Sequence, residues 1–387
     1  MKPRALRAVP AAVACWLLLA PAAQADWERI TSASPTTTSG QTALVRTPDA
    51  LHMVWRATSA SYRHRIDHRA VLPDGTLSPT VTVTEDWIEM SDPGLTASTE
   101  GLRAIWGGVR SAHPDEINTE LNTALTVDGG TTWSVQDGSI VQPGTDAADA
   151  PVSAAAQADG APLAAWATGG GTWTHRGVDP AVPVVNIQAP LGGSGTRPGV
   201  ASVGARTVVA WYSSSSAGRG VYAQEIAPDG SAAGAPTVMP GTTSVRTPMS
   251  GRTPVASRIG GKVFVVYAVG STASKRILLW NVGSGTTRTI ARAAGEVTAT
   301  VTADPQGRLY VAWTTRSGGR DRVMVRRSNA RATSFGDVVD ASRPPSGAVA
   351  RSLDMSAIDG SVDVVAGYSA QGSERVSSFF SRVELER

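Results

Sequence analysis

A short apolar segment that ends in an aromatic residue recurs seven times along the chain, and this repeat constrains the fold more than any other feature. The copies occupy residues 51–55, 102–106, 162–166, 208–211, 264–267, 309–313 and 364–368, the last being the most diverged. Their spacing runs from about 45 to about 60 residues and averages near 52. A period of this length is typical of repeat proteins, in which each repeat buries its apolar faces against its neighbours.

Each repeat has room for four short strands. A second apolar segment precedes each aromatic copy by about 13 residues, often after a proline such as Pro93 or Pro198, and a turn rich in Gly, Asp or Asn joins the two. Two more strand candidates follow, at 220–225 and 235–238 in the fourth repeat. Apolar residues alternate with period two and show no helical period. The sequence therefore predicts an all-β fold, a seven-bladed β-propeller, with a six-bladed ring as the alternative.

The last repeat is one strand short, because the chain ends soon after residue 383. A spare segment, residues 27–30, precedes the first repeat. We predict that this N-terminal segment supplies the outer strand of the last blade. Such a closure would join the two ends of the ring and cover an exposed strand edge.

The N-terminus is typical of a secretory signal peptide. Lys2, Arg4 and Arg7 precede an apolar stretch, and Ala23-Gln24-Ala25 suits signal peptidase. We expect residues 1–25 to be removed, leaving residues 26–387 as one secreted, monomeric propeller domain. The apolar stretch is too short to span a bilayer comfortably, and no later segment is apolar enough, so we expect no membrane span. The single cysteine lies inside the signal, which excludes disulfides from the mature chain.

Charge gives no support for a nucleic-acid partner. The whole chain has 35 Lys and Arg against 32 Asp and Glu, and the signal holds three of the basic residues and no acidic one. The mature chain is therefore formally neutral, whereas nucleic-acid-binding domains are usually basic.

Residues 126–133 read Thr-Val-Asp-Gly-Gly-Thr-Thr-Trp and predict a tight hairpin turn. The Asp128 carboxylate can accept bonds from its own turn, and Gly130 allows a positive φ. The pattern resembles the Asp-box, or BNR repeat, of the sialidase-like propeller superfamily. The resemblance implies a structural role for the fixed positions, which are Thr126, Asp128, Gly130, Thr132 and Trp133.

The same resemblance sets an expectation for catalysis. Sialidases carry three arginines for the substrate carboxylate, a Tyr/Glu nucleophile pair and an acid/base Asp. The nearest match to the first arginine is Arg252, in Arg252-Thr253-Pro254 at the start of a strand. A surface residue before a strand is the alternative interpretation of Arg252. Asp115 and Glu116 are further candidates for catalytic carboxyls.

Several residues are candidates for a ligand site at one mouth of the propeller, because long loops carry function more often than the scaffold does. The long loop 107–120 carries Arg110 and His113, and the preceding segment carries Trp87 and Glu89. Trp173 follows three glycines. An aromatic ring beside acids suits sugar binding, although solvated loop residues are the alternative for each.

The sequence contains no phosphate-binding loop, zinc spacing or nucleophile elbow, so we expect no cofactor. His64 and His68 alternate onto one strand face, but no third ligand is in view, so we expect no metal.

Three functions remain open on the sequence alone. The leading hypothesis is recognition of an extracellular glycan or protein at the mouth of the second and third repeats. The second is a glycoside hydrolase of sialidase-like type. Three arginines that converge on one pocket beside a Tyr–Glu pair would favour it. The third is a structural surface protein. An empty mouth lined by small residues would favour it.

Overall fold

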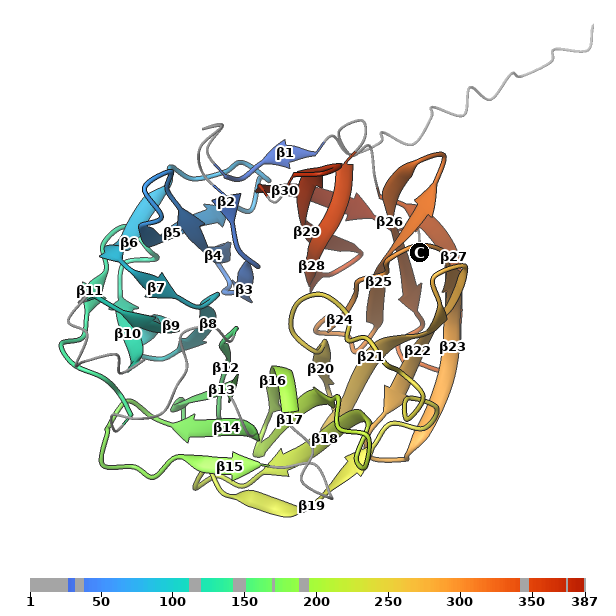
Figure 1. The fold of residues 1–387 in the computed structure, drawn as a ribbon, viewed down its shortest axis with the longest axis horizontal. Coiled ribbons are helices and arrows are strands. Elements are labelled where there is room, and N and C mark those ends of the chain that lie inside the picture. The colour runs from blue at the N-terminus through green and yellow to red at the C-terminus, as the bar shows by residue number, and fades with distance from the viewer. Residues whose placement is uncertain are drawn as a thin grey trace, which may run out of the picture.

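Seven antiparallel sheets surround a common axis and form a seven-bladed β-propeller (Figure 1). The computed structural model describes residues 27–31, 38–110, 120–141, 151–168, 171–187, 195–341, 348–373 and 375–385, and these residues form strands and connections without a helix. Accordingly, no helix in this part of the chain could cross a membrane. The predicted fold class and the blade number of seven are confirmed. The predicted signal, residues 1–25, lies outside the described residues.

The strands follow the predicted repeat. Blade 1 contains β2 (Thr38–Ser39), β3 (Ala43–Arg46), β4 (Leu51–Thr58), β5 (His64–Val71) and β6 (Val81–Trp87). Blade 2 contains β7 (Glu89–Met90), β8 (Gly94–Ser98), β9 (Gly101–Val109), β10 (Glu120–Thr126) and β11 (Ser134–Val135). Blade 3 contains β12 (Ser153–Ala156), β13 (Pro162–Thr168), β14 (Gly171–Arg176) and β15 (Val185–Ile187). Blade 4 contains β16 (Gly195–Val203), β17 (Arg206–Ser213), β18 (Gly220–Ile226) and β19 (Ala232–Val238).

The remaining blades have the same plan. Blade 5 contains β20 (Val255–Arg258), β21 (Lys262–Ser271), β22 (Ser274–Asn281) and β23 (Thr286–Ala293). Blade 6 contains β24 (Ala299–Ala303), β25 (Leu309–Ser317), β26 (Arg320–Ser328) and β27 (Phe335–Asp340). Blade 7 contains β28 (Ala348–Ile358), β29 (Ser361–Ala370), β30 (Val376–Glu384) and β1 (Glu28–Arg29).

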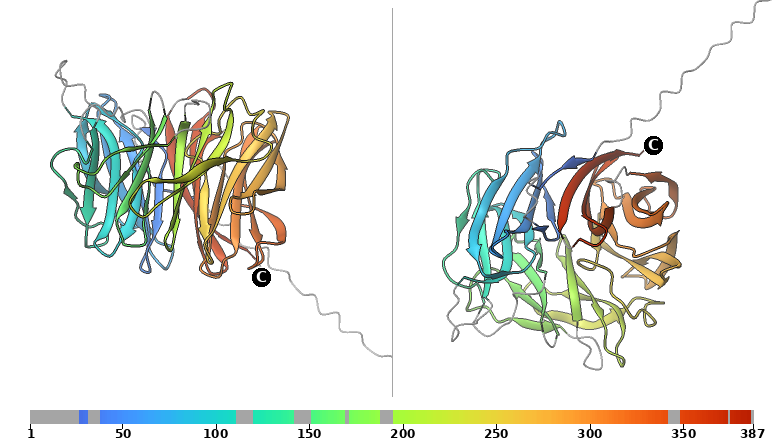
Figure 2. Two further views of the ribbon diagram at one scale, coloured as in Figure 1. Left: turned by 90° about the horizontal axis from the view of Figure 1, so that it is seen from below. Right: turned by 45° about the horizontal axis from the view of Figure 1, so that its top comes forward.

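The strands of each blade run as an antiparallel meander from the axis to the rim. The innermost strands β3, β8, β12, β16, β20, β24 and β28 each contact the next around the axis, and β28 contacts β3. The turns after the first and third strands of a blade therefore share one face of the disc, here called the lower face. The turn after the second strand and the connection to the next blade share the opposite, upper face (Figure 2).

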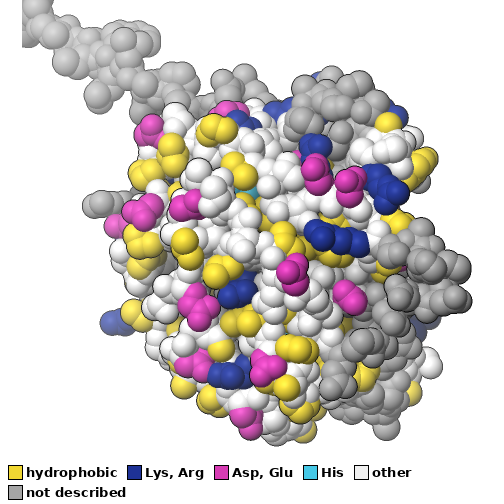
Figure 3. Space-filling view, turned by 90° about the vertical axis from the view of Figure 1, so that its left-hand side faces the viewer, with side chains coloured by type: hydrophobic (Ala, Val, Ile, Leu, Met, Phe, Trp, Pro, Cys, Tyr) yellow, Lys and Arg dark blue, Asp and Glu magenta, His cyan; other side chains and the backbone are white. Residues whose placement is uncertain are grey.

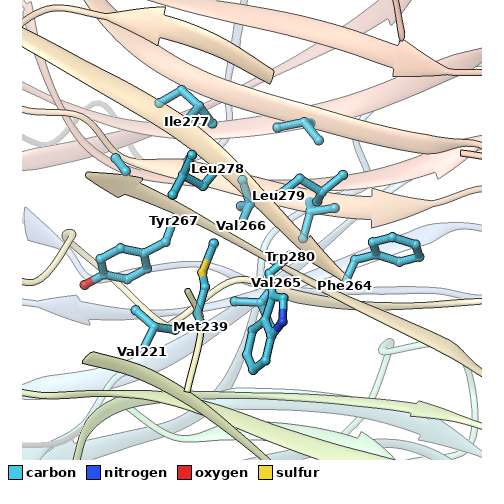
Figure 4. Close-up of a cluster of buried hydrophobic side chains, with 14 of the residues drawn as sticks. Val221, Met239, Phe264, Val265, Val266, Tyr267, Ile277, Leu278, Leu279 and Trp280 are labelled. Carbon is cyan, nitrogen blue, oxygen red and sulfur yellow. The ribbon is translucent and has the colours of Figure 1, made fainter. Parts of the chain in front are cut away.

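The recurring aromatic residues fill the interfaces between blades. Those on the second strands, each no more than 3 % exposed, are Trp55, Trp106, Trp166, Trp211, Tyr267, Trp313 and Tyr368. Figure 4 shows one part of this core, where β21 and β22 of blade 5 pack with Val221 and Met239 of blade 4. Burying one large apolar side chain stabilises a fold by about 1.5 to 3 kcal/mol. The aromatic residues that recur about every 52 residues in the sequence are therefore the residues that recur in the core of each blade.

The N-terminal segment closes the ring as predicted. Strand β1 pairs with β30, with Glu28 opposite Phe380 and Arg29 opposite Phe379. The Ile30 side chain is 1 % exposed and packs in one cluster with Phe380. The Trp27 indole Nε1 donates a hydrogen bond of 2.8 Å to the Ala341 carbonyl. The first and last segments of the fold therefore share one sheet.

Candidate functional site

The innermost strands enclose a pocket on the propeller axis, with a volume of about 290 Å3. Small and hydroxyl side chains dominate its wall, among them Ser153, Ser257, Thr298 and Thr300. Small residues are required because the blades converge here. An added Cβ at Gly199 would lie 1.9 Å from the Thr253 carbonyl oxygen of the next blade. The result is a narrow pocket with a polar wall.

Arg252 crosses the upper end of this pocket. It lies in the connection from blade 4 to blade 5 and borders the pocket. Its guanidinium donates to three main-chain carbonyls on the far side of the axis: Nε to Val152 at 2.9 Å, Nη1 to Thr42 at 3.3 Å and Nη2 to Pro93 at 2.5 Å. These three carbonyls precede the innermost strands of blades 3, 1 and 2. One side chain therefore fastens blade 5 to three other blades.

Asp354 supplies the carboxylate of the pocket. It lies on β28 and lines the pocket together with Arg252. The Gln41 side chain joins the two, because its Nε2 donates to Asp354 Oδ2 at 3.0 Å and its Oε1 accepts from the Arg252 main-chain N–H at 2.9 Å. Burial raises the pKa of Asp354 to about 6, although Arg252 and Gln41 act in the opposite direction. Burial therefore favours the protonated form of this carboxyl more than in an exposed aspartate.

The structure assigns Arg252 a different role from the one that the resemblance implies. All three guanidinium nitrogens already bond to main-chain oxygens, which favours a structural contact over a substrate-carboxylate clamp. Among the described residues that line the pocket, Arg252 is the one arginine. Arg56 instead pairs with Asp92 at 3.1 Å, and Arg197 donates to the Met249 carbonyl at 2.7 Å. The sialidase-type triad is therefore not formed around this pocket in the described part of the chain.

Trp87 and Arg110 contact each other, but the Trp87 ring is buried and cannot stack on a sugar. Trp87 is 3 % exposed and lies edge-on to Trp106, with ring centroids 5.5 Å apart. The Arg110 guanidinium lies 4.7 Å from the centroid of the Trp87 ring, a cation–π contact. Glu89 is exposed nearby on β7. Trp87 was predicted at the mouth as a ligand-site candidate, but the interface between blades 1 and 2 covers its ring.

Trp173 was expected at the mouth as well. The structure places it on β14, directly opposite Trp166 of β13. It packs in the apolar cluster between blades 2 and 3 with Ile105. The glycines before Trp173 resembled a loop in the sequence, yet Gly171 already belongs to the strand. Trp173 is half-buried there, and its role in ligand binding stays a prediction. His113, Asp115 and Glu116 lie outside the described residues.

The turn predicted at residues 126–133 is present on the lower face. Asp128 Oδ1 accepts from the Thr126 hydroxyl at 2.7 Å and from the Thr132 main-chain N–H at 3.0 Å. Asp128 Oδ2 accepts from the Thr132 hydroxyl at 2.6 Å. These bonds hold the pKa of Asp128 well below its usual range. The Trp133 indole donates to the Gly130 carbonyl at 3.2 Å, so the predicted positions form one hydrogen-bonded turn.

His52 and His68 form a contact next to this turn that the sequence did not predict. His68 Nε2 lies 3.2 Å from His52 Nδ1, whereas His64 bonds to the Thr58 hydroxyl at 2.9 Å. The two histidines of β5 therefore do not form a common site. Burial, together with the neighbouring His52, lowers the pKa of His68 to about 4. No group of three or more potential metal ligands occurs in the described part of the chain.

Gly130 is required for this packing, which gives a direct test. Gly130 has φ +92°, and an added Cβ would lie 2.0 Å from His68 Cε1. Gly129 has φ +70° but faces open space. We expect Gly130→Ala to lower the free energy of unfolding by about 2 to 4 kcal/mol, and the control Gly129→Ala by about 1 kcal/mol. Urea unfolding of both variants measures this difference. Equal losses would show that the His68 contact contributes nothing beyond backbone strain.

Comparison with known proteins supports the fold. No protein-family model matches the chain, and no curated protein matches its sequence. Among solved structures, a protein of unknown function from Dyadobacter fermentans has a TM-score of 0.55 at 11% identity, covering 91% of this chain and 96% of its own. The polysaccharide lyase Uly1 has a TM-score of 0.52 at 9% identity, covering 92% and 91%. A K499G mutant of NanB sialidase from Streptococcus pneumoniae has a TM-score of 0.51 at 9% identity, covering 92% and 70%. The chain thus has a sialidase-like propeller fold.

Proposed function

We propose that the protein is secreted and recognises an extracellular carbohydrate in the axial pocket without cleaving it. The polar wall of the pocket carries this proposal. Its hydroxyl groups, such as those of Ser153 and Thr300, can both donate and accept hydrogen bonds. Its volume of about 290 Å3 is near the lower end of ligand pockets, which suits one sugar unit.

Asp354 gives this pocket a strong acceptor. An ionised carboxylate accepts hydrogen bonds from sugar hydroxyls, and bonds to ionised groups are stronger than neutral ones. Gln41 holds Asp354 in place by a hydrogen bond, and the charge of Arg252 favours the ionised form of Asp354. The proposal therefore places sugar hydroxyls against Asp354 and the Ser and Thr side chains. The sialidase and the lyase that share the fold act on carbohydrates, as their names state, which supports the choice of ligand.

The alternative is a glycoside hydrolase of sialidase-like type. A glycosidase usually needs two carboxyl groups flanking the bond to be cleaved. Asp354 is the one carboxyl among the described residues that line the pocket. One observation favours the alternative, namely that a carboxyl with a pKa of about 6 can act as a general acid near neutral pH.

A glycan array to which purified residues 26–387 are applied distinguishes the two functions. It should be scored for retained protein and for loss of terminal sialic acid. We expect retention without loss. Release of sialic acid would establish the hydrolase instead, and absence of both signals would favour a protein ligand.

The affinity for a retained glycan should depend on pH through Asp354. Since the carboxylate is the acceptor, affinity should fall by up to about tenfold per pH unit below pH 6. Asp354→Asn should weaken binding and remove this pH dependence. Asp359→Asn, an exposed acid on the same blade, should change neither. An unchanged pH profile in Asp354→Asn would place the ligand outside the axial pocket.

A further inference from the structure

Charge is distributed unequally around this formally neutral ring. Blades 1 to 3, residues 38–187, contain 8 Lys and Arg against 17 Asp and Glu, a net charge of −9. Blades 5 and 6, residues 255–340, contain 13 Lys and Arg against 5 Asp and Glu, a net charge of +8. These blades lie on opposite sides of the axis (Figure 1). Figure 3 views the side of blades 1 to 3, where acidic side chains are spread over the surface.

Five cations gather on the upper face where blades 5 and 6 meet. This cationic junction consists of Lys275, Arg276, Arg292, Arg316 and Arg320. They come from the upper hairpin of blade 5, the end of β23 and the upper hairpin of blade 6. Main-chain bonds hold these segments together.

The bonds are short and local. The Gly295 N–H donates to the Thr272 carbonyl at 2.8 Å, and the Arg316 N–H donates to the Ala294 carbonyl at 2.9 Å. An added Cβ at Gly295 would lie 2.9 Å from Arg316 Cβ, which shows how closely the two blades approach. The cations are thus presented from a rigid surface.

Two members of the cationic junction repel each other. Arg276 and Arg292 lie directly opposite in the register of β22 and β23, and both are exposed. Like charges in such cross-strand positions destabilise a sheet. Within the described residues, no ion pair within 4.0 Å involves Arg276, Arg292 or Arg320. A bound anion would relieve this repulsion.

Two acidic residues nearby neutralise the junction only in part. Asp321 is buried and lies 4.0 Å from Arg316. Glu296 is exposed and acts electrostatically on Lys275. The five cations therefore keep a net charge of +3 after both acids are counted.

We infer that the cationic junction binds an anionic polysaccharide, one that bears carboxylate or sulfate groups. The planar guanidinium fork matches both groups. The large exposed hydrophobic side chains of the described residues lie elsewhere, so the junction offers neither an aromatic platform for nucleic-acid bases nor an apolar wedge for a membrane. The choice of a carbohydrate rests on the proposed function, whereas the charge argument stands without it.

The test compares two double variants of equal charge. Arg276→Gln/Arg292→Gln removes the repelling pair. Arg63→Gln/Arg331→Gln removes two exposed arginines outside the junction, one in blade 1 and one on the lower face of blade 6. Binding to polygalacturonate, dextran sulfate and neutral dextran is measured at low and at physiological ionic strength. We expect the wild type to bind the two polyanions and to lose affinity as salt is added. The first variant should bind about tenfold more weakly, and the second should match the wild type.

Each other outcome overturns the inference. Equal losses in the two double variants would mean that overall charge matters and the junction does not. Preference for duplex DNA or for phosphatidylserine vesicles over both polysaccharides would assign the junction to another partner. Binding that Asp354→Asn abolishes and Arg276→Gln/Arg292→Gln leaves intact would place all recognition in the axial pocket, which keeps the proposed function and rejects this second surface.

Discussion

Replacing Arg252 with methionine should lower the free energy of unfolding by about 3 to 5 kcal/mol, the usual cost of removing one partner from a buried charged network. Methionine keeps much of the length of the side chain but donates no hydrogen bond. The carbonyls of Thr42, Pro93 and Val152 would each lose a donor near the axis. Asp354 would lose the nearby positive charge that favours its ionised form. Thermal and urea unfolding measure the loss.

Two further variants make this result specific. Arg206→Met removes a half-exposed arginine that pairs with Glu225, and it should cost no more than about 1 kcal/mol. Arg252→Met/Asp354→Asn should lose less than the sum of the single changes, because the second substitution removes the carboxylate left without compensation. If Arg252→Met were no more harmful than Arg206→Met, Arg252 would not fasten the blades together.

The repeat pattern predicted most of the fold because it records local requirements. A strand that packs on both faces needs apolar and aromatic residues wherever it recurs, and all seven copies became the second strands of blades. The closing strand was predicted for a similar reason. A missing strand at one end of the chain and a spare segment at the other end can be counted in the sequence alone.

The candidate site was predicted less well because its contacts are not local. The three carbonyls that hold Arg252 lie 210, 159 and 100 residues away, and main-chain oxygens leave no trace in a sequence. Arg252 was found beside its strand, but its partners were not. The burial of Trp87 could not be predicted for the complementary reason. An aromatic beside acids or glycines has the same local sequence whether a neighbouring blade covers it or not.

Removing residues 26–34 should lower the melting temperature by about 5 °C. Ile30 alone buries a side chain whose loss costs about 2 to 5 kcal/mol. The hydrogen bonds of β1 to β30, and that of the Trp27 indole, add about 1 kcal/mol each. Ordering these residues costs about 1 to 2 kcal/mol per residue, which offsets part of the gain. For a protein of this size, each kcal/mol of net loss lowers the melting temperature by about 2 °C.

Point variants of the full chain test the same contact if the shortened protein does not fold. Ile30→Ala should lower the free energy of unfolding by about 2 to 4 kcal/mol, whereas Glu28→Ala on the same strand should have little effect, because Glu28 is exposed. Equal effects of the two substitutions would contradict the packing of β1 described above.

A synthetic peptide of residues 26–34 then tests whether the lost stability comes from the pairing of β1 with β30. If β1 stabilises the ring by pairing with β30, the peptide should raise the melting temperature of the shortened protein, by an amount that grows with its concentration. Covalent linkage keeps the strand at an effective concentration of about millimolar or more, so the free peptide should be needed in that range. A peptide with Ile30→Ala should rescue less, because it lacks the side chain that packs with Phe380. Rescue by both peptides alike would mean that edge hydrogen bonds close the ring and that the buried side chain does not.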